Sequence, residues 1–310
     1  MKLFFRISIF FLFFIYPSRH NSQVNDTILP VIELDSISIE ASKAEELDIN
    51  AFISMMIHDE SFYTAFKNLR TASYNFKNEI LILKKDRQTV QAAYQSEAYQ
   101  EYLKPCRSMV EKPIQVVGDY FGSNHENKWY TSKLYDRLFF THGKVCIDSS
   151  KEHNVEPDKM EGHVRELKKL IFAPGTRSHV PLLGDKTAIF DEEMQPYYDY
   201  RFRVDTIQSQ PYYLFEVEVK PLFKVKGQNK TVIKKLQTWF TTDTHQIIRR
   251  DYQLVGNTIA YSFDVTMHVD VINVRGRFFP SFIQYDGTWK IFSKKRENAK
   301  FTISFNDFKF

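Results

Sequence analysis

Glycine, cysteine and net charge are all in short supply in this sequence. Only 10 of its 310 residues are glycine, whereas it has 28 phenylalanines, 17 tyrosines and 3 tryptophans. Many aromatic residues with little glycine suit strands and large apolar surfaces better than repeats of tight turns. We therefore expect a fold rich in strands.

The recurring sequence motifs of enzymes are absent. The sequence has no His-Glu-x-x-His pair, no Gly-x-Ser-x-Gly elbow, no Gly-x-Gly-x-x-Gly loop and no Walker loop. The fragment from His163 to Glu166 comes nearest to the first, but it lacks the second histidine. The acidic residues 191–193 lack the spacing of a calcium loop and are expected in a solvated turn. We predict that the protein is not an enzyme and uses no cofactor or metal.

The N-terminus has the pattern of a signal peptide. Lys2 and Arg6 precede an apolar run over residues 7–16, which Pro17 ends. That run is much shorter than the roughly 20 residues that a membrane-spanning helix needs. We predict a signal peptide over 1–22, with an uncleaved anchor as the alternative. No cysteine follows the run, so a lipoprotein anchor is not expected, and the localisation is periplasmic or envelope-associated.

Little charge remains after that segment is removed. The loss of Lys2, Arg6 and Arg19 lowers the formal net charge from +4 to +1. A nucleic-acid partner would require a basic field, so none is expected. No later stretch approaches transmembrane length.

The two cysteines, Cys106 and Cys146, allow two interpretations. They supply too few local ligands for a zinc site. In an exported protein they can pair, because the envelope is oxidising. They can also remain buried thiols that act as small hydrophobic groups, and a thiol nucleophile paired with a histidine has no local support.

Helical patterns occupy much of the N-terminal half. Residues 23–41 are polar and read as a tether or an edge strand, and two helices are expected over 42–70. In the second of these, Phe62, Phe66 and Leu69 recur at helical spacing. Further helices are expected at 128–140 and 161–172. Strands are expected at 73–83 and around 114–117, while 89–102 fits either type.

The C-terminal half alternates between apolar and polar residues over many short segments. The expected strands are 197–204, 212–219, 235–241, 246–254, 260–271, 278–285, 290–293 and 299–308. Turn residues separate them, among them Gly256 and the pair Asp286 and Gly287. Sequential strands with short turns predict an antiparallel meander.

A long meander must curl, and its apolar face needs a cover. We predict an α+β fold in which a curled antiparallel sheet, an unclosed half-barrel, wraps around a few helices in a single domain over 42–310. If the helices fill the concave side incompletely, a cavity remains. The residues expected to line it are Phe62, Phe66, Leu69, Phe215, Val217, Trp239, Phe263 and Phe282. The alternative, which residue counts alone favour, is that these aromatic residues are simply core.

Three segments resemble the outer-membrane lipoprotein carrier (LolA-like) superfamily. They are Thr-Trp-Phe-Thr-Thr-Asp-Thr-His-Gln-Ile-Ile-Arg-Arg-Asp at 238–251, the hairpin at 270–285 with Gly-Arg-Phe-Phe-Pro, and the closing strand at 301–308. The resemblance covers 197–310. It implies an unclosed antiparallel barrel around helices, with a hydrophobic cavity for acyl chains or another lipophilic ligand, and it implies no chemistry.

These patterns lead to two functional hypotheses. The first is a periplasmic binding or carrier protein that holds a lipid or a lipoprotein acyl chain in a hydrophobic cavity. The second is a non-enzymatic structural or interaction component of an envelope complex, which would present an exposed apolar patch or strand edge to a protein partner.

Overall fold

The computed structural model describes residues 37–39, 49–147, 170–178, 183–224, 230–291 and 295–310. The chain divides into two units, Met1–Ile32 and Glu33–Phe310, and every described residue belongs to the second. The predicted signal peptide and most of the helix predicted at 161–172 therefore lie outside the described residues.

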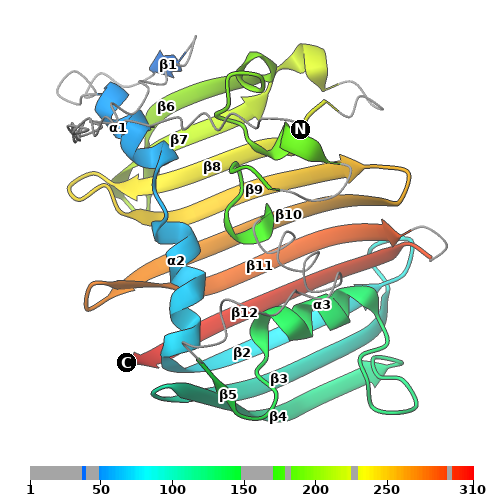
Figure 1. Ribbon diagram of the computed structural model, residues 1–310. Helices are drawn as coiled ribbons and strands as arrows, with labels where there is room; N and C mark the ends of the chain where they lie inside the picture. Colours follow the sequence, from blue (N-terminus) through cyan, green and yellow to red (C-terminus); the bar gives the residue numbers. More distant parts are fainter. Residues whose placement is uncertain (1–36, 40–48, 148–169, 179–182, 225–229, 292–294) are drawn as a thin grey trace, which may run out of the picture. The chain divides into compact units, whose positions relative to one another are not determined.

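The described strands form one sheet (Figure 1). The strands are β1 (Ile37–Ile39), β2 (Ser73–Leu83), β3 (Val90–Leu103), β4 (Cys106–Gly118), β5 (Val145–Cys146), β6 (Tyr198–Ile207), β7 (Gln210–Val219), β8 (Ile233–Thr241), β9 (Ile247–Asn257), β10 (Tyr261–Val274), β11 (Arg277–Ile291) and β12 (Glu297–Lys309). Their order is β1-β6-β7-β8-β9-β10-β11-β12-β2-β3-β4-β5. All pairs are antiparallel except β1 with β6. The two end strands do not pair with each other, so the sheet is an unclosed half-barrel, as predicted.

The sheet extends further than the meander predicted at 197–308. Its last strand, β12, pairs with β2, and Phe301 lies opposite Ile80. From β2 the sheet continues through β3 to β4, so the ambiguous segment 89–102 is a strand and the strand predicted around 114–117 is much longer. Pairing between segments so far apart in sequence leaves no local pattern, which is why the sequence did not indicate it.

Two segments predicted as turns lie inside strands, and these predictions were wrong. Gly287 lies within β11, which runs on to Ile291, and Gly256 lies within β9. A Cβ atom at Gly287 would lie 2.0 Å from the hydroxyl oxygen of Tyr285, and one at Gly256 would lie 2.4 Å from Cε1 of Phe263. Glycine at these positions lets an aromatic ring lie across the strand, so it marks a close approach and not a turn.

Helices cover one face of the sheet (Figure 1). They are α1 (Ile49–Ile57), α2 (Ser61–Asn68), which continues as the 3-10 turn η2 (Leu69–Thr71), and α3 (Tyr130–Phe139); η3 (Gly184–Thr187), η4 (Gln195–Tyr197) and η5 (Pro221–Phe223) are single 3-10 turns. The α2 helix packs on β11 and α3 on β12. The predictions of two helices within 42–70 and one within 128–140 agree with these elements.

The N-termini of helices α2 and α3 each have a carboxylate partner. Before α2, Asp59 accepts hydrogen bonds from the backbone N–H and the hydroxyl of Ser61, at 2.8 and 2.7 Å. At α3, the Glu297 carboxylate on β12 accepts the N–H groups of Tyr130 and Thr131 at 2.9 and 3.0 Å. A carboxylate satisfies these otherwise unpaired donors and complements the helix dipole, so Glu297 anchors α3 to the sheet.

The two faces of the sheet differ in polarity, because side chains alternate along each strand. On the helix-covered face, hereafter the inner face, one row crosses nine strands and is buried throughout: Tyr200, Val217, Leu236, Tyr252, Met267, Tyr285, Phe301, Ile80 and Tyr94. One residue away on each strand lies the corresponding row of the outer face: Arg201, Glu216, Gln237, Asp251, His268, Gln284, Thr302, Glu79 and Gln95. The core therefore lies between the inner face and the helices.

Candidate functional site

A pocket of about 380 Å³ opens between α2 and α3 over the inner face. Its volume lies at the lower end of the range typical of small-molecule sites, about 300–1,000 Å³. The apolar part of its lining is formed by Tyr63, Phe66, Leu69, Tyr74, Leu138, Phe139, Phe140 and Phe172. Its polar part is formed by Lys67, Arg70, Gln100, Arg107, Arg137 and Thr141. We call this cavity the α2–α3 pocket.

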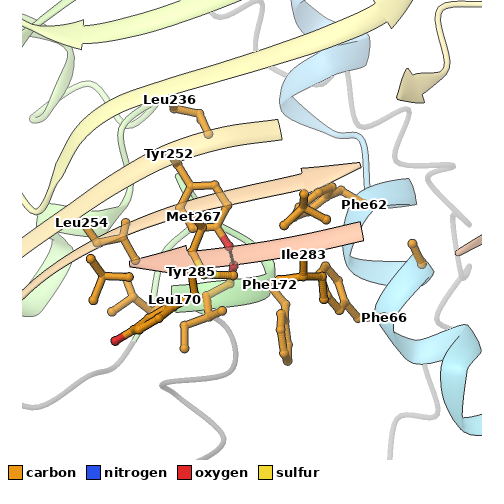
Figure 2. Packing of buried hydrophobic residues seen from close by; sticks show 14 of the residues in the cluster. Phe62, Phe66, Leu170, Phe172, Leu236, Tyr252, Leu254, Met267, Ile283 and Tyr285 are labelled. Carbon is orange, nitrogen blue, oxygen red and sulfur yellow. Dashed lines mark hydrogen bonds between the residues drawn. The ribbon is translucent and has the colours of Figure 1, made fainter. Parts of the chain in front are cut away.

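Aromatic rings build the apolar wall. Phe66 on α2 stacks on Phe172 with ring centroids 4.1 Å apart, and Phe139 on α3 meets the same ring edge-on at 6.2 Å. The hydroxyl of Tyr252 on β9 donates a hydrogen bond to the carbonyl oxygen of Ile171, which fixes the backbone beside Phe172 (Figure 2). Figure 2 shows Phe66 and Phe172 next to each other beneath the sheet. The wall thus joins α2, α3 and the segment 170–172.

Gln100 joins both sides of the pocket. Its side chain is buried, and its Nε2 donates to the carbonyl oxygens of Leu69 and Ala72 at 2.6 and 2.9 Å. Its Oε1 accepts the hydroxyl of Thr141 at 3.2 Å, beyond the end of α3. Because one amide bonds η2 on one side and the residue after α3 on the other, it holds the two sides at a fixed separation.

Arg107 projects into the pocket from β4. Its Nε–H donates to Thr141 Oγ1 at 3.3 Å, and the residue is partly buried. Burial lowers the pKa of the Arg107 guanidinium, and the nearby charge of Arg70 lowers that pKa further. Burial raises the pKa of the neighbouring Tyr74 hydroxyl, although Arg107 opposes that rise. The pocket therefore contains a cation that donates a hydrogen bond to Thr141 and is repelled by a second cation.

A disulfide between Cys106 and Cys146 fixes the strand end that carries Arg107. The two cysteines lie opposite each other where β4 pairs with β5, and Arg107 lies opposite Val145. Of the two interpretations that the sequence left open, the structure has the disulfide. It closes a loop that contains α3, so it restrains the pocket wall as well as the edge of the sheet.

The predicted cavity residues divide into three groups. Phe66 and Leu69 line the α2–α3 pocket. Phe62, Phe215, Val217 and Phe263 are fully buried in the core and do not line it. Phe62, for example, covers the guanidinium of Arg250, whose central carbon lies 4.4 Å from the ring centroid.

The remaining two predicted residues, Trp239 and Phe282, lie on the outer face, which corrects the expectation for them. Trp239 lies opposite Arg249, and Phe282 opposite Asp270. Arg249 Nε donates to Asp270 Oδ1 at 2.7 Å, which places all four on one face. Each residue lies three positions along its strand from an inner-face residue, Trp239 from Leu236 and Phe282 from Tyr285, so the alternation of side chains places both on the outer face.

Much of the pocket comes from residues that sequence patterns did not single out. Tyr74, Gln100 and Arg107 lie on strands of the N-terminal half, for which no site was predicted. The pairing of Cys106 with Cys146 would have pointed to Arg107 and to α3, but the sequence left that pairing open.

A second hollow, of about 440 Å³, lies beside α3, and both acidic and basic side chains line it. Within it, Glu111 accepts hydrogen bonds from Tyr94 and Ser96 at 2.5 and 2.6 Å. In the part of the chain that the structure describes, no three His, Cys, Asp or Glu side chains cluster as metal ligands would. None of the described helices has the length and apolar character to cross a membrane.

Comparison with known proteins gives matches of structure only. No family model and no curated protein matches the sequence. The chain is similar to a LolA superfamily protein from Nitrosomonas europaea (9% identity, 82% of this chain, 92% of the other, TM-score 0.26). It is also similar to a DUF1329 family protein from Desulfovibrio piger, with 10% identity over 80% of this chain and 90% of the other and a TM-score of 0.25. A third match is a putative outer membrane lipoprotein-sorting protein domain from Vibrio parahaemolyticus, with 6% identity over 79% of this chain and 90% of the other and a TM-score of 0.25. These matches include the superfamily that residues 197–310 resemble. The fold is assigned from the strand order and pairing of the sheet and not from these matches, whose TM-scores are low.

Proposed function

We propose that the protein is a periplasmic carrier that holds a lipid or a lipoprotein acyl chain in a hydrophobic pocket and catalyses no reaction. The α2–α3 pocket is the observation that carries this proposal, because a space of about 380 Å³ remains open against aromatic rings between the helices and the inner face. Its lining combines aromatic and aliphatic side chains with six polar ones, and concave sites that combine the two are typical of small-molecule binding.

The pocket is built to persist without a ligand. Gln100 bonds both sides, Glu297 anchors α3, and the disulfide from Cys106 closes the loop around it. Binding to a preformed cavity does not incur the cost of ordering it. A carrier that takes up and releases one chain repeatedly needs this property.

The test is direct binding of a lipophile. Delipidated protein is titrated with a fluorescent fatty-acid probe, and native mass spectrometry examines the purified protein for bound lipid. We expect saturable binding of one probe per chain and a co-purified lipid. The absence of both would overturn the proposal.

A second candidate function, an interaction component of an envelope complex, is favoured by the surface of β4. Val110, Ile114 and Val116 are 73%, 58% and 48% exposed. In the described part of the chain, β5 pairs only with Cys106 and Arg107, so the rest of that edge of β4 has no partner strand. An exposed strand edge with apolar side chains is a template for another chain. Cross-linking in envelope extracts that captures lipid but no protein would count against this candidate.

A further inference from the structure

All the charged side chains in the lining of the α2–α3 pocket are cations. Lys67, Arg70, Arg107 and Arg137 line it, and no carboxylate does. None of the four forms an ion pair with any residue in the described ranges. The ammonium nitrogen of Lys67 lies 4.3 Å from the centroid of the Tyr63 ring. Four cations therefore line one pocket of about 380 Å³, and the described part of the chain supplies no carboxylate to pair with them.

Several cations on the outer face of the sheet are paired. Arg249 bonds Asp270 at 2.7 Å, and Arg201 bonds Glu216 at 3.2 Å. Lys77 bonds Glu97 at 2.7 Å. These outer-face cations lie beside carboxylates, whereas the lining of the pocket supplies four cations and no carboxylate.

The four cations differ in how firmly they are held. Arg107 is partly buried and bonded to Thr141, which Gln100 bonds in turn. Lys67, Arg70 and Arg137 are exposed on the two helical sides. The terminal N–H groups of Arg107 have no hydrogen-bond partner among the described residues. A partly buried guanidinium is a strong, directional donor to a carboxylate or a phosphate, whereas the exposed cations contribute a more general attraction.

The apolar wall and the cations lie on the same cavity, so a ligand can contact both. Phe66, Phe139 and Phe172 supply one part, and Arg107 with Arg70 supplies the other. We propose that the α2–α3 pocket takes a single-chain anionic amphiphile, with its chain against these rings and its carboxylate or phosphate head on Arg107 and Arg70. This inference rests on the proposed carrier function and specifies its ligand class.

The small volume of the α2–α3 pocket limits how many acyl chains it can hold. A cavity of about 380 Å³ is at the low end for a drug-sized ligand. It accommodates one chain, and a lipid with several acyl chains would leave most of its apolar surface in water. The ligand is therefore a free one-chain lipid and not a multiply acylated lipoprotein.

The experiment compares head groups on one chain. Delipidated full-length protein is titrated with a fluorescent fatty acid, with its neutral methyl ester and with an alkyl phosphate of the same length. We expect the two anionic probes to bind roughly tenfold more tightly than the ester, the factor expected for a hydrogen-bonded charge. Inorganic phosphate alone is the fourth probe, and it should bind far more weakly than the alkyl phosphate.

Variants assign the effect to the pocket. Arg107→Gln should lower the affinity for the fatty acid roughly tenfold. Arg70→Gln should lower it roughly threefold, because Arg70 is more exposed and its ion pair with the ligand is weaker. Neither should change binding of the ester. Arg107→Lys keeps the charge and should recover part of the loss. Arg203→Gln, which removes one charge from an outer-face ion pair, is the matched control and should change nothing.

The outcomes separate the two levels of the proposal. If the fatty acid and its ester bind equally tightly, and Arg107→Gln changes neither affinity, the proposal of an anionic ligand is overturned. The proposed carrier function is then unaffected. Failure of all lipophilic probes overturns both. Inorganic phosphate binding as tightly as the alkyl phosphate shows a site for free anions and also overturns the inference. A thermal unfolding midpoint within about 3 °C of that of the parent shows that a variant is folded. Such a shift corresponds to a change of about 1 kcal/mol in the free energy of unfolding.

Discussion

The imidazole of His268 lies between two carboxylates, with Nδ1 2.6 Å from Asp251 Oδ1 and Nε2 3.2 Å from Asp270 Oδ2. Asp270 also accepts the Nε–H of Arg249 at 2.7 Å, and the ring of Phe282 faces the imidazole at 5.9 Å. These contacts connect β9, β10 and β11 on the outer face, where the other residues of the same row are polar.

This arrangement predicts that stability falls in mild alkali. Hydrogen bonds to Asp251 and then to Asp270 raise the pKa of His268 to about 9, from 6.5. A raised folded-state pKa stabilises the folded protein fully below about pH 6.5, and that contribution is lost as the pH rises through about 9. After discounting for partial exposure we expect a loss of about 1–2 kcal/mol. Denaturant titrations at pH 6, 8 and 10 measure it.

His268→Gln is the comparison for that experiment. The variant should be less stable than the parent at pH 6 and lose less stability between pH 6 and pH 10. The same pH dependence in both proteins would contradict the assignment to His268.

Gln100 should be a stability residue as well as a pocket residue. Gln100→Ala leaves the carbonyl oxygens of Leu69 and Ala72 without this donor, and an unsatisfied buried polar group costs about 1–3 kcal/mol. We expect the thermal midpoint to fall by roughly 2–10 °C. Gln115→Ala, on the exposed surface of β4, is the control. A midpoint unchanged in both would show that Gln100 does not connect the two sides.

The anchor of α3 on the sheet gives a local prediction. Glu297→Ala removes the acceptor for Tyr130 and Thr131 and should cost about 0.5–2 kcal/mol, as loss of a helix cap does. Amide exchange should accelerate in α3 more than in β9. Glu101→Ala, an exposed residue on β3, should leave both rates unchanged. Uniform acceleration over the sheet would contradict a local anchor.

Gly287 should tolerate no side chain. A methyl group there would collide with the Tyr285 hydroxyl, which accepts the indole N–H of Trp289 at 2.6 Å. Gly287→Ala should therefore cost about 1–3 kcal/mol by overpacking. Gly122→Ala is the control, because its new Cβ would meet Glu126 at an ordinary 3.6 Å. Chemical denaturation compares the two, and equal effects would argue against a special role for Gly287.

Sequence patterns predicted local features well and long-range ones poorly. The spacing of Phe62, Phe66 and Leu69 predicted α2 correctly, because helical periodicity is a local property. The prediction of a turn at Gly287 was wrong. The absence of a side chain there makes room for the ring of Tyr285, which lies two residues earlier on the same strand. Alternation placed Phe215 correctly on the inner face.

The candidate site was predicted only in part, for a related reason. Trp239 and Phe282 lie an odd number of residues from Leu236 and Tyr285 of the inner face, so apolar character alone did not show which face of the strand they occupy. Arg107 and Gln100 reach the pocket through pairing of β2, β3 and β4 with the C-terminal sheet, which only the three-dimensional structure reveals.

The central claim is that a lipid chain lies in the α2–α3 pocket, and photo-crosslinking with a diazirine fatty acid tests it most directly. Peptide mapping by mass spectrometry locates the label, and the unlabelled fatty acid serves as competitor. The account predicts competed labels in peptides that contain Phe66, Phe139 or Phe172. Competed labels confined to the exposed surface of β4, around Val110 and Ile114, or no competed label at all, would contradict it.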